Sequence, residues 1–249
     1  MKHTLHILIS AIVFALASCS KQSTPPGTAS LTLINAVPGS TPSLVTNFGG
    51  TGPITWYNNA LKLVYGTAGN TNQTGSYSGM QKLAIYRFPD TLVQSKPLFN
   101  LTLDLKQGAI YTLFLTGTIT NPDTLFTTDT PPYHPPTDST LGIRFVNLSP
   151  GSTPVSVNIA GNANGSEVSS LPFKGITGYK NYPATAAVST YKFEFRDAVT
   201  GVLINTLDVT GINAASNAKR FRNYTVALLG LPGDAVTKKT MLIDAYLSN

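Results

Sequence analysis

The sequence is poor in the side chains from which most enzyme and metal sites are built. It has one cysteine, Cys19, and three histidines among 249 residues, so no disulfide can form within the chain. Charged residues make up only 11% of the sequence, with 17 basic and 11 acidic side chains. The one dense basic cluster, residues 219–222, could contact a phosphate or polyanion, but so short a run is typical of a solvated loop. We therefore predict no nucleic-acid partner.

The amino terminus has the features of a secretion signal. Lys2 precedes an apolar run over residues 5–16, which is too short to span a bilayer comfortably, and no later stretch is long and apolar enough to do so. Leu-Ala-Ser then leads directly to Cys19. This segment resembles a bacterial lipoprotein signal, which implies that residues 1–18 are removed and that Cys19 carries acyl chains such as palmitate. The alternative is an ordinary secretory signal in which Cys19 has no special role.

The residues after Cys19 bear on location. Residues 19–29 are polar and contain proline, so we predict a lipidated tether that holds the folded part away from a membrane. Ser20 is not the aspartate that favours inner-membrane retention in lipoproteins, so the resemblance implies the outer membrane. The stretch also lacks the acidic run that marks surface export in some Bacteroidetes-like lipoproteins, so both the periplasmic face and the cell surface remain open.

Loss of the signal would leave His134 as the only histidine. A catalytic triad needs a base beside its nucleophile, and a zinc site needs several His or Cys ligands. We therefore predict no cofactor, no metal site and no enzyme. A carbohydrate-active enzyme with two paired carboxylates is the less favoured alternative, because Glu194 lies between Lys192 and Arg196, where charge pairing on a strand is the simpler explanation.

One short phrase occurs twice. Asn-x-x-Pro-Gly-Ser-Thr-Pro stands at residues 35–42 and again at residues 147–154, each time after a strand-like apolar run. The five residues from the first proline to the second include no acid, base or thiol, and Pro and Gly restrict backbone geometry. We therefore predict that the phrase is scaffold, a strand end followed by a turn.

The pattern between the two phrases predicts strands. Leu101, Leu103 and Leu105 alternate with polar residues, which indicates a strand with one buried face. Residues 110–115 are almost continuously apolar, which predicts a central strand, and residues 223–230 repeat them in the second half. Spacings between matching strands vary, as expected if only the loops differ in length.

The fold class we predict is all-β, with two tandem immunoglobulin-like antiparallel β-sandwich domains. The first would span residues 30–130 and the second residues 141–249. The Pro- and Thr-rich residues 131–140 would form a semi-stiff linker between separable units.

The same alignment of the two halves predicts two matched pairs of acids. Asp104 and Asp208 would occupy equivalent outward positions, and Asp129 and Asp244 equivalent strand ends. Such symmetry favours structural roles over catalysis.

The second unit also carries a family resemblance. Its motifs are Leu-Pro-Phe-x-Gly-x-x-x-Tyr at residues 171–179, Tyr-x-Phe-x-Phe-Arg at 191–196 and Tyr-Thr-Val-x-Leu-Leu-Gly at 224–230, after the Asn-x-x-Pro-Gly turn. Together they resemble the family called domain of unknown function 4397, found in bacterial envelope lipoproteins. The first unit departs from the pattern at residues 63–79. The resemblance implies an extracytoplasmic β-sandwich and supplies no site residues.

Binding is the function class that we favour. Trp56 and Tyr57, followed by two asparagines, suit stacking on a sugar ring, and Tyr77, Tyr179 and Tyr182 offer similar material. A lone Trp in a sandwich is, however, more often part of the core. We predict an adhesion or binding module for a glycan or an envelope protein, and an assembly subunit that pairs through an edge strand is the alternative.

Overall fold

The computed structural model describes residues 26–49, 60–69, 72–90, 92, 94–214 and 218–245. Cys19, Trp56 and Tyr57 lie outside these ranges, so the structure does not test the predictions made for them. The described residues form sixteen strands and no α-helix, which confirms the all-β prediction. Within these residues there is accordingly no helix that could cross a membrane.

The strands divide into two sets of eight. The first set is β1 (Thr28–Asn35), β2 (Leu44–Phe48), β3 (Lys62–Leu63), β4 (Gln73–Tyr77), β5 (Gly79–Arg87), β6 (Phe99–Leu105), β7 (Ile110–Gly117) and β8 (Pro122–Asp129). The second set is β9 (Thr140–Leu148), β10 (Val155–Ile159), β11 (Val168–Leu171), β12 (Lys180–Pro183), β13 (Thr190–Asp197), β14 (Leu203–Thr210), β15 (Asn223–Leu229) and β16 (Lys239–Ala245).

Each set builds a sandwich of two four-stranded sheets. The orders are β4-β1-β7-β8 and β3-β2-β5-β6 in the first unit, and β12-β9-β15-β16 and β11-β10-β13-β14 in the second. Adding eight to each strand number of the first unit gives the second, which confirms the predicted duplication. All neighbours are antiparallel except β1 with β7 and β9 with β15, which are parallel.

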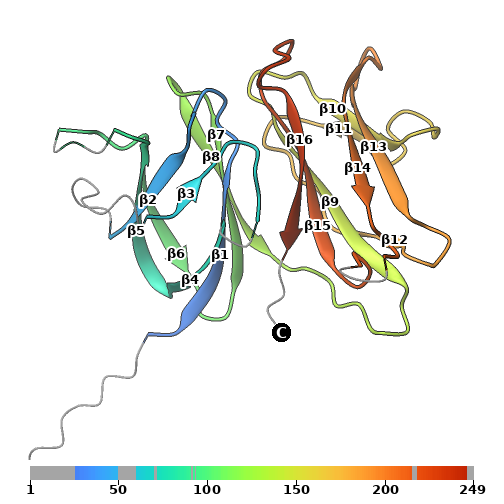
Figure 1. The fold of residues 1–249 in the computed structure, drawn as a ribbon, viewed down its shortest axis with the longest axis horizontal. Coiled ribbons are helices and arrows are strands. Elements are labelled where there is room, and N and C mark those ends of the chain that lie inside the picture. The colour runs from blue at the N-terminus through green and yellow to red at the C-terminus, as the bar shows by residue number, and fades with distance from the viewer. Residues whose placement is uncertain are drawn as a thin grey trace, which may run out of the picture.

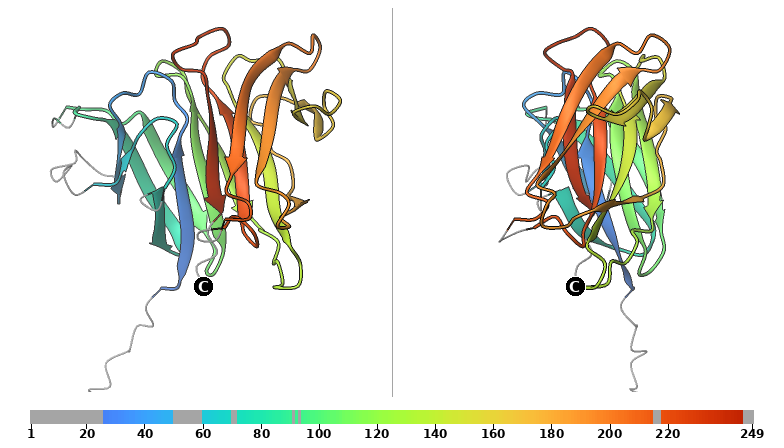
Figure 2. Two further views of the ribbon diagram at one scale, coloured as in Figure 1. Left: turned by 45° about the vertical axis from the view of Figure 1, so that its right-hand side comes forward. Right: turned by 90° about the vertical axis from the view of Figure 1, so that its right-hand side faces the viewer.

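The four sheets lie in layers, and the β4-β1-β7-β8 sheet faces the β12-β9-β15-β16 sheet (Figures 1 and 2). We call the contact between these two sheets the seam. A third hydrophobic core fills it, besides the core inside each sandwich. Its buried members are Ile34, Ala36, Tyr65, Phe114, Val146, Leu148, Ala227, Leu229, Met241 and Ile243.

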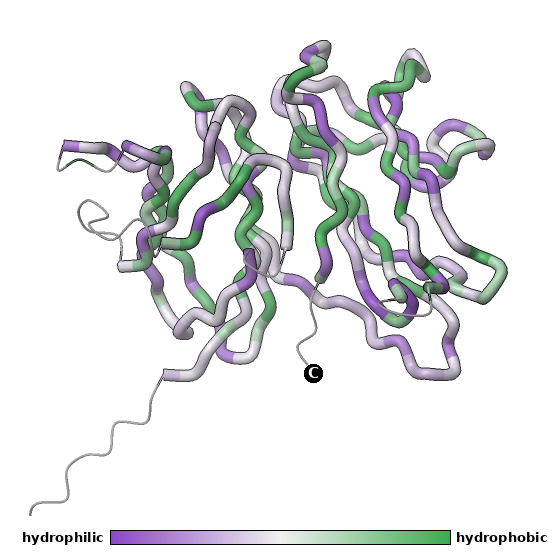
Figure 3. The backbone as a smooth tube through the Cα atoms, in the orientation of Figure 1, coloured by the Kyte–Doolittle hydropathy of each residue, from purple (hydrophilic) through white to green (hydrophobic). Residues whose placement is uncertain are grey.

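The seam explains the continuous apolar runs in the sequence. In β7, Tyr111, Leu113 and Leu115 point into the first sandwich, while Phe114 points into the seam. Both faces of the strand are therefore buried, as in sheets covered on both sides. The prediction that residues 110–115 form a central strand is confirmed, and Figure 3 shows the hydrophobic residues concentrated along the strands.

The repeated phrase is scaffold, as predicted. Asn35 is fully buried, and its Nδ2 donates to Ser40 Oγ and to the Leu63 carbonyl, both at 2.9 Å. Asn147 is buried likewise and donates to the Leu171 carbonyl at 3.1 Å. Each asparagine thus fixes its own turn and ties the end of one sheet to the short strand β3 or β11 of the opposite sheet.

The expectation of a spacer between separable units is wrong. His134 is 6% exposed, and its ring nitrogens lie 3.0 Å from Thr140 Oγ1 and 3.0 Å from Asn223 Oδ1. Asn223 Nδ2 donates to the Pro132 carbonyl at 2.8 Å. The segment after β8 is therefore fastened to the second sandwich, and the shared seam core joins the two units.

The pairing of Asp104 with Asp208 was also wrong. We call two residues equivalent when they hold the same place in the two sets of strand ladders. The Lys192 carbonyl accepts the same loop hydrogen bond as the Lys82 carbonyl, so these two lysines are equivalent. Asp208 pairs with Lys192, whereas Asp104 pairs with Met80, two residues before Lys82. The two acids are therefore two positions out of register. Both remain exposed.

Asp129 and Asp244 are not equivalent either. Tyr111 and Tyr224 hold the same place in β7 and β15, and they pair with Thr128 and Asp244. Asp244 is therefore equivalent to Thr128. Because alternate residues of a strand point to opposite faces, a shift of one residue puts Asp129 and Asp244 on opposite faces of their sheets.

Candidate functional site

A buried ion pair crosses the seam. Arg144 Nη1 lies 2.8 Å from Asp129 Oδ1, and the two side chains are 7% and 2% exposed. Thr112 and Thr127 donate hydroxyl hydrogen bonds to the Asp129 carboxylate, while Arg144 Nε donates to Thr225 Oγ1 at 2.8 Å. These bonds compensate the cost of burying both charges.

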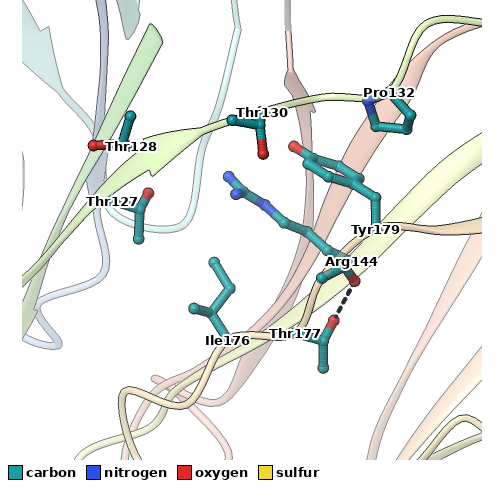
Figure 4. Close-up of a pocket in the computed structure, with 9 residues that line it drawn as sticks. Thr127, Thr128, Thr130, Pro132, Arg144, Ile176, Thr177 and Tyr179 are labelled. Carbon is teal, nitrogen blue, oxygen red and sulfur yellow. Dashed lines mark hydrogen bonds between the residues drawn. The ribbon is translucent and has the colours of Figure 1, made fainter. Parts of the chain in front are cut away.

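A pocket opens beside this ion pair (Figure 4). Its volume is about 350 Å³, and its walls come from β8, from the segment that follows β8, from β9 and from the loop before β12. The lining residues are Thr127, Thr128, Thr130, Pro132, Arg144, Ile176, Thr177, Gly178 and Tyr179. We call it the seam pocket, because both units supply its walls.

Tyr179 forms one wall of the seam pocket. The guanidinium carbon of Arg144 lies 4.8 Å from the centre of its ring, a cation–π contact. Its hydroxyl is buried and has no hydrogen bond of good geometry within the described residues. Burial raises the pKa of Tyr179 to about 12, although Arg144 and the nearby Thr225 hydroxyl act in the opposite direction. The hydroxyl therefore stays protonated at neutral pH.

A second pocket lies at the opposite edge of the seam. It has a volume of about 120 Å³ and is lined by Thr32, Ala68, Gly69, Asn72, Gln73, Tyr224, Leu242, Ile243 and Asp244. The end of β16 meets the segment before β4 here, just as the end of β8 meets the segment before β12 at the seam pocket. Exchange of the two units converts one contact into the other, which is the arrangement of a two-fold symmetric interface.

The two pockets differ in the residues at equivalent positions. Thr32 is equivalent to Arg144, and Gln73 is equivalent to Tyr179. Gln73 Nε2 donates to the Asp244 carbonyl at 3.2 Å and so bridges the seam. A lining side chain of the smaller pocket thus makes a hydrogen bond to the other unit.

The structure separates the tyrosines that the sequence grouped together. Tyr182 is 3% exposed in the core of the second sandwich, where its hydroxyl donates to Glu167 Oε2 at 2.6 Å. Burial and this carboxylate raise its pKa. Tyr77 is 60% exposed on the edge strand β4. Only Tyr179 lines the seam pocket, and Tyr179 and Tyr182 point to opposite faces of their sheet.

Glu194 and Asp197 have local partners. No group of three or more His, Cys, Asp or Glu side chains in the described ranges is placed to hold a metal ion. Glu194 accepts from Asn158 and Arg196, and these bonds lower its pKa. Asp197 caps the β13–β14 hairpin by accepting from Thr200 and from the backbone of Val199. Both acids act within their own sheet.

Arg144 and Asp129 are the site residues that sequence reasoning missed. The available signal was the single charged residue in the otherwise apolar run Ile143-Arg144-Phe145-Val146. A charge within a strand that is buried on both faces needs a partner of opposite charge. The run alone did not identify that partner, because it comes from the other unit.

Comparison with known proteins gives distant structural likenesses. A streptococcal virulence factor described by its alpha-glucan binding shares 10% identity at a TM-score of 0.28, with 90% of this chain and 100% of that chain covered. A carbohydrate-binding module of family CBM26 from Eubacterium rectale, solved with maltoheptaose, shares 13% identity at 0.26, covering 89% of this chain and 98% of that one. A putative adhesin from Bacteroides ovatus shares 9% identity at 0.22, with 84% and 90% covered. At such low TM-scores these likenesses carry no argument about function.

No curated protein matches the chain. A protein-family model, however, matches residues 29–158, from β1 into β10. The resemblance noted from the sequence was placed mainly on the second unit, whereas this match covers the first unit and the first two strands of the second. The matched region is more than half of the chain, which therefore belongs to the family described as Domain of unknown function (DUF4397).

Proposed function

We propose that this protein is a lipid-anchored cell-envelope module that binds a saccharide without catalysis. The anchoring rests on the resemblance of residues 16–19 to a lipoprotein signal and on the polar tether that follows. The outer membrane is the proposed location. The binding function rests on the seam pocket.

The observation that carries the binding proposal is the composition of the seam pocket. A saccharide ring offers hydroxyls for hydrogen bonding and an apolar face for stacking. The pocket combines the ring of Tyr179 with the hydroxyl of Thr130, and its volume is at the lower end of the range for ligand sites. Its walls are held by the buried ion pair and by the seam core, so the site is preorganised.

Glycan binding is tested with the chain from residue 19 onward carrying Cys19→Ser, which removes the lipid. We expect retention on a glycan array that is lost on Tyr179→Ala, because the change removes the stacking wall. Tyr77→Ala and Trp56→Ala are the comparison variants, since the sequence alone favoured those residues. Loss of binding in either of them, with Tyr179→Ala unaffected, would move the site away from the seam.

The lipid anchor is tested separately in cells. A clickable palmitate analogue should label the parent protein and Ser20→Ala, but not Cys19→Ser. Equal labelling of all three would remove the anchor from the proposal and leave the binding function standing.

A protein ligand is the second candidate, favoured by a different surface. Val199 and Val202 in the β13–β14 hairpin are 85% and 63% exposed, and Val236 in the β15–β16 loop is 85% exposed. Both loops lie at the same end of the second sandwich (Figure 1). A triple change to serine should abolish capture of a stoichiometric envelope partner if the protein is an assembly subunit, and should leave glycan binding intact if it is not.

A further inference from the structure

The turn before β15 differs from its counterpart in the first unit. Asn223 is equivalent to Ile110, so residues 219–222 are equivalent to residues 106–109. Each turn has one residue with a left-handed backbone, Gly108 at φ +74° and Phe221 at φ +65°. Glycine adopts this conformation without strain, whereas a bulky aromatic residue rarely does. The second unit therefore holds an aromatic side chain where glycine would fold more easily.

Three basic residues accompany Phe221 in residues 219–222, which we call the basic turn. Arg220 and Arg222 are exposed, and the guanidinium carbon of Arg220 lies 4.9 Å from the centre of the Phe221 ring. Arg222 Nη1 lies 3.7 Å from Asp244 Oδ2. Lys219 and Arg220 form no ion pair within the described residues. The basic turn thus presents positive charge that the protein does not neutralise.

The basic turn lies at the end of the molecule where the tether would join the first sandwich. The Gly108 amide donates to the Thr28 carbonyl, and the Phe221 amide to the Thr140 carbonyl, both at 2.8 Å. Thr28 and Thr140 begin β1 and β9, and both strands start at the same end (Figures 1 and 2). The chain from residue 19 to residue 28 reaches at most about 30 Å. A lipid on Cys19 would therefore bring this end closest to the membrane.

Asp104, Asp138 and Asp208 stand near the same end of their strands, and each has a neighbour of its own. Asp104 Oδ2 lies 2.7 Å from Lys106 Nζ, and Asp138 accepts a hydrogen bond from the first residue of β9. Asp208 stands opposite Lys192 on the adjacent strand. These acids therefore leave the charge of the basic turn in place.

Exposed tyrosine and methionine side chains lie at this end as well. Tyr77 and Met80 are 60% and 67% exposed beside the β4–β5 turn, which donates a hydrogen bond to the residue before β1. Tyr133 is 77% exposed in the segment that Asn223, the residue after the basic turn, holds by a hydrogen bond. Tyrosine is typical of the interface between a membrane and water, where its ring and its hydroxyl are both accommodated.

We propose that this end of the molecule rests on an anionic membrane surface, with the basic turn bound to lipid phosphate groups. The proposal rests on the lipid anchoring proposed above, because a lipid and a basic patch together hold a protein on a membrane more firmly than either alone. A guanidinium binds two phosphate oxygens at once, and the Phe221 ring orients that of Arg220. The exposed valines of the opposite end then point away from the membrane, where a partner can reach them.

The test is sedimentation with vesicles of the chain from residue 19 onward, carrying Cys19→Ser. Vesicles of equal parts phosphatidylcholine and phosphatidylglycerol should bind at least about tenfold more tightly than phosphatidylcholine alone, and less tightly as salt rises. Lys219→Ala with Arg220→Ala should weaken this binding about twentyfold, since each basic residue near an anionic surface contributes about fivefold. Lys96→Ala with Lys238→Ala is the matched control, because it removes the same charge from loops at the opposite end and should have little effect.

A second variant tests the aromatic residue. Phe221→Gly keeps all the charges and copies Gly108, which already holds this backbone conformation in the equivalent turn. It should weaken binding to the anionic vesicles, although less than the double change, because the ring no longer orients Arg220. Unchanged binding would overturn the part assigned to Phe221.

The remaining outcomes separate this inference from the anchoring on which it rests. Equal binding to both kinds of vesicle, or equal losses in the two double variants, would overturn the membrane-facing end and leave palmitate labelling at Cys19 unaffected. Heparin or glycerol phosphate binding as tightly as the anionic vesicles would replace the membrane with a soluble anion. Vesicle binding that persists without labelling of Cys19 would support the surface and overturn only the anchor.

Discussion

The two edges of the seam are built on one plan but differ in buried charge and in the size of their pockets. At one edge Arg144 and Asp129 form a buried ion pair beside an open pocket. At the other, the equivalent positions hold Thr32 and Ala245, and Gln73 of the smaller pocket donates a hydrogen bond across the seam. The strand order is the same in both units, so the two edges differ in their side chains and not in topology.

The same comparison extends to the seam core. Phe114 in β7 is equivalent to Ala227 in β15, and both are fully buried in that core. The seam core thus holds a large side chain at one of these two equivalent positions and a small one at the other. Complementary volumes of this kind allow two similar sheets to pack closely without voids.

The largest expected effect comes from removing the large partner. Phe114→Ala makes both equivalent positions small and leaves a cavity, so the free energy of unfolding should fall by about 3–5 kcal/mol. Denaturant unfolding measures it. Phe126→Ala is the control: Phe126 is 37% exposed and stacks on Tyr111, so its loss should cost much less. Equal costs would mean that the seam core contributes nothing beyond a surface contact.

The next effect tests the charged edge. Asp129→Ala leaves Arg144 buried without its partner and should cost about 3 kcal/mol or slightly more. The double variant Arg144→Thr with Asp129→Ala copies the residues of the other edge and leaves no unpaired charge. It should be closer to the parent in stability than Asp129→Ala. A double variant whose cost equals the sum of the two single changes would show that the ion pair is not coupled.

A third effect should be the same in both units. Asn35→Ala and Asn147→Ala each leave a buried turn amide and a strand carbonyl without their side-chain partners. Each change should lower the free energy of unfolding by about 2 kcal/mol, and exchange to serine should not restore it because serine cannot reach both groups. Clearly different costs in denaturant unfolding would show that the repeated phrase does not have the same function twice.

Local sequence patterns were sufficient to predict most of the fold. The repeated phrase and the period-two runs were sufficient to identify a duplicated β-sandwich, because turns and half-buried strands depend on neighbouring residues. Residues 110–115 were correctly placed at the centre of a sheet, but the reason for their second buried face was out of reach, since it lies in the other unit.

The contacts between distant segments could not be predicted in this way. Asp129 and Asp244 both stand near the end of a matching strand, but they differ by one position in the strand ladders, and a one-residue shift on a strand changes the face and with it the role. The composition around His134 predicts a spacer, and the sequence does not reveal its contact with Asn223 because that residue is far along the chain. The seam pocket was missed for the same reason, and only Tyr179 among its lining residues was singled out from the sequence.

The smallest expected effect concerns Asp244, on the edge without a buried ion pair. Burial raises the pKa of Asp244 despite Arg222 and Lys219, so its ionised form opposes folding. The free energy of unfolding therefore rises as the pH falls through the folded-state pKa of Asp244, and this increase is absent at neutral pH. Asp244→Asn should stabilise the protein at pH 7 by less than about 1 kcal/mol, since the side chain is 35% exposed and solvent screens it. Denaturant midpoints at pH 7 and pH 3 measure the difference, which should vanish at the lower pH. A variant less stable than the parent at pH 7 would mean that the contact with Arg222 outweighs the cost of burying the carboxylate.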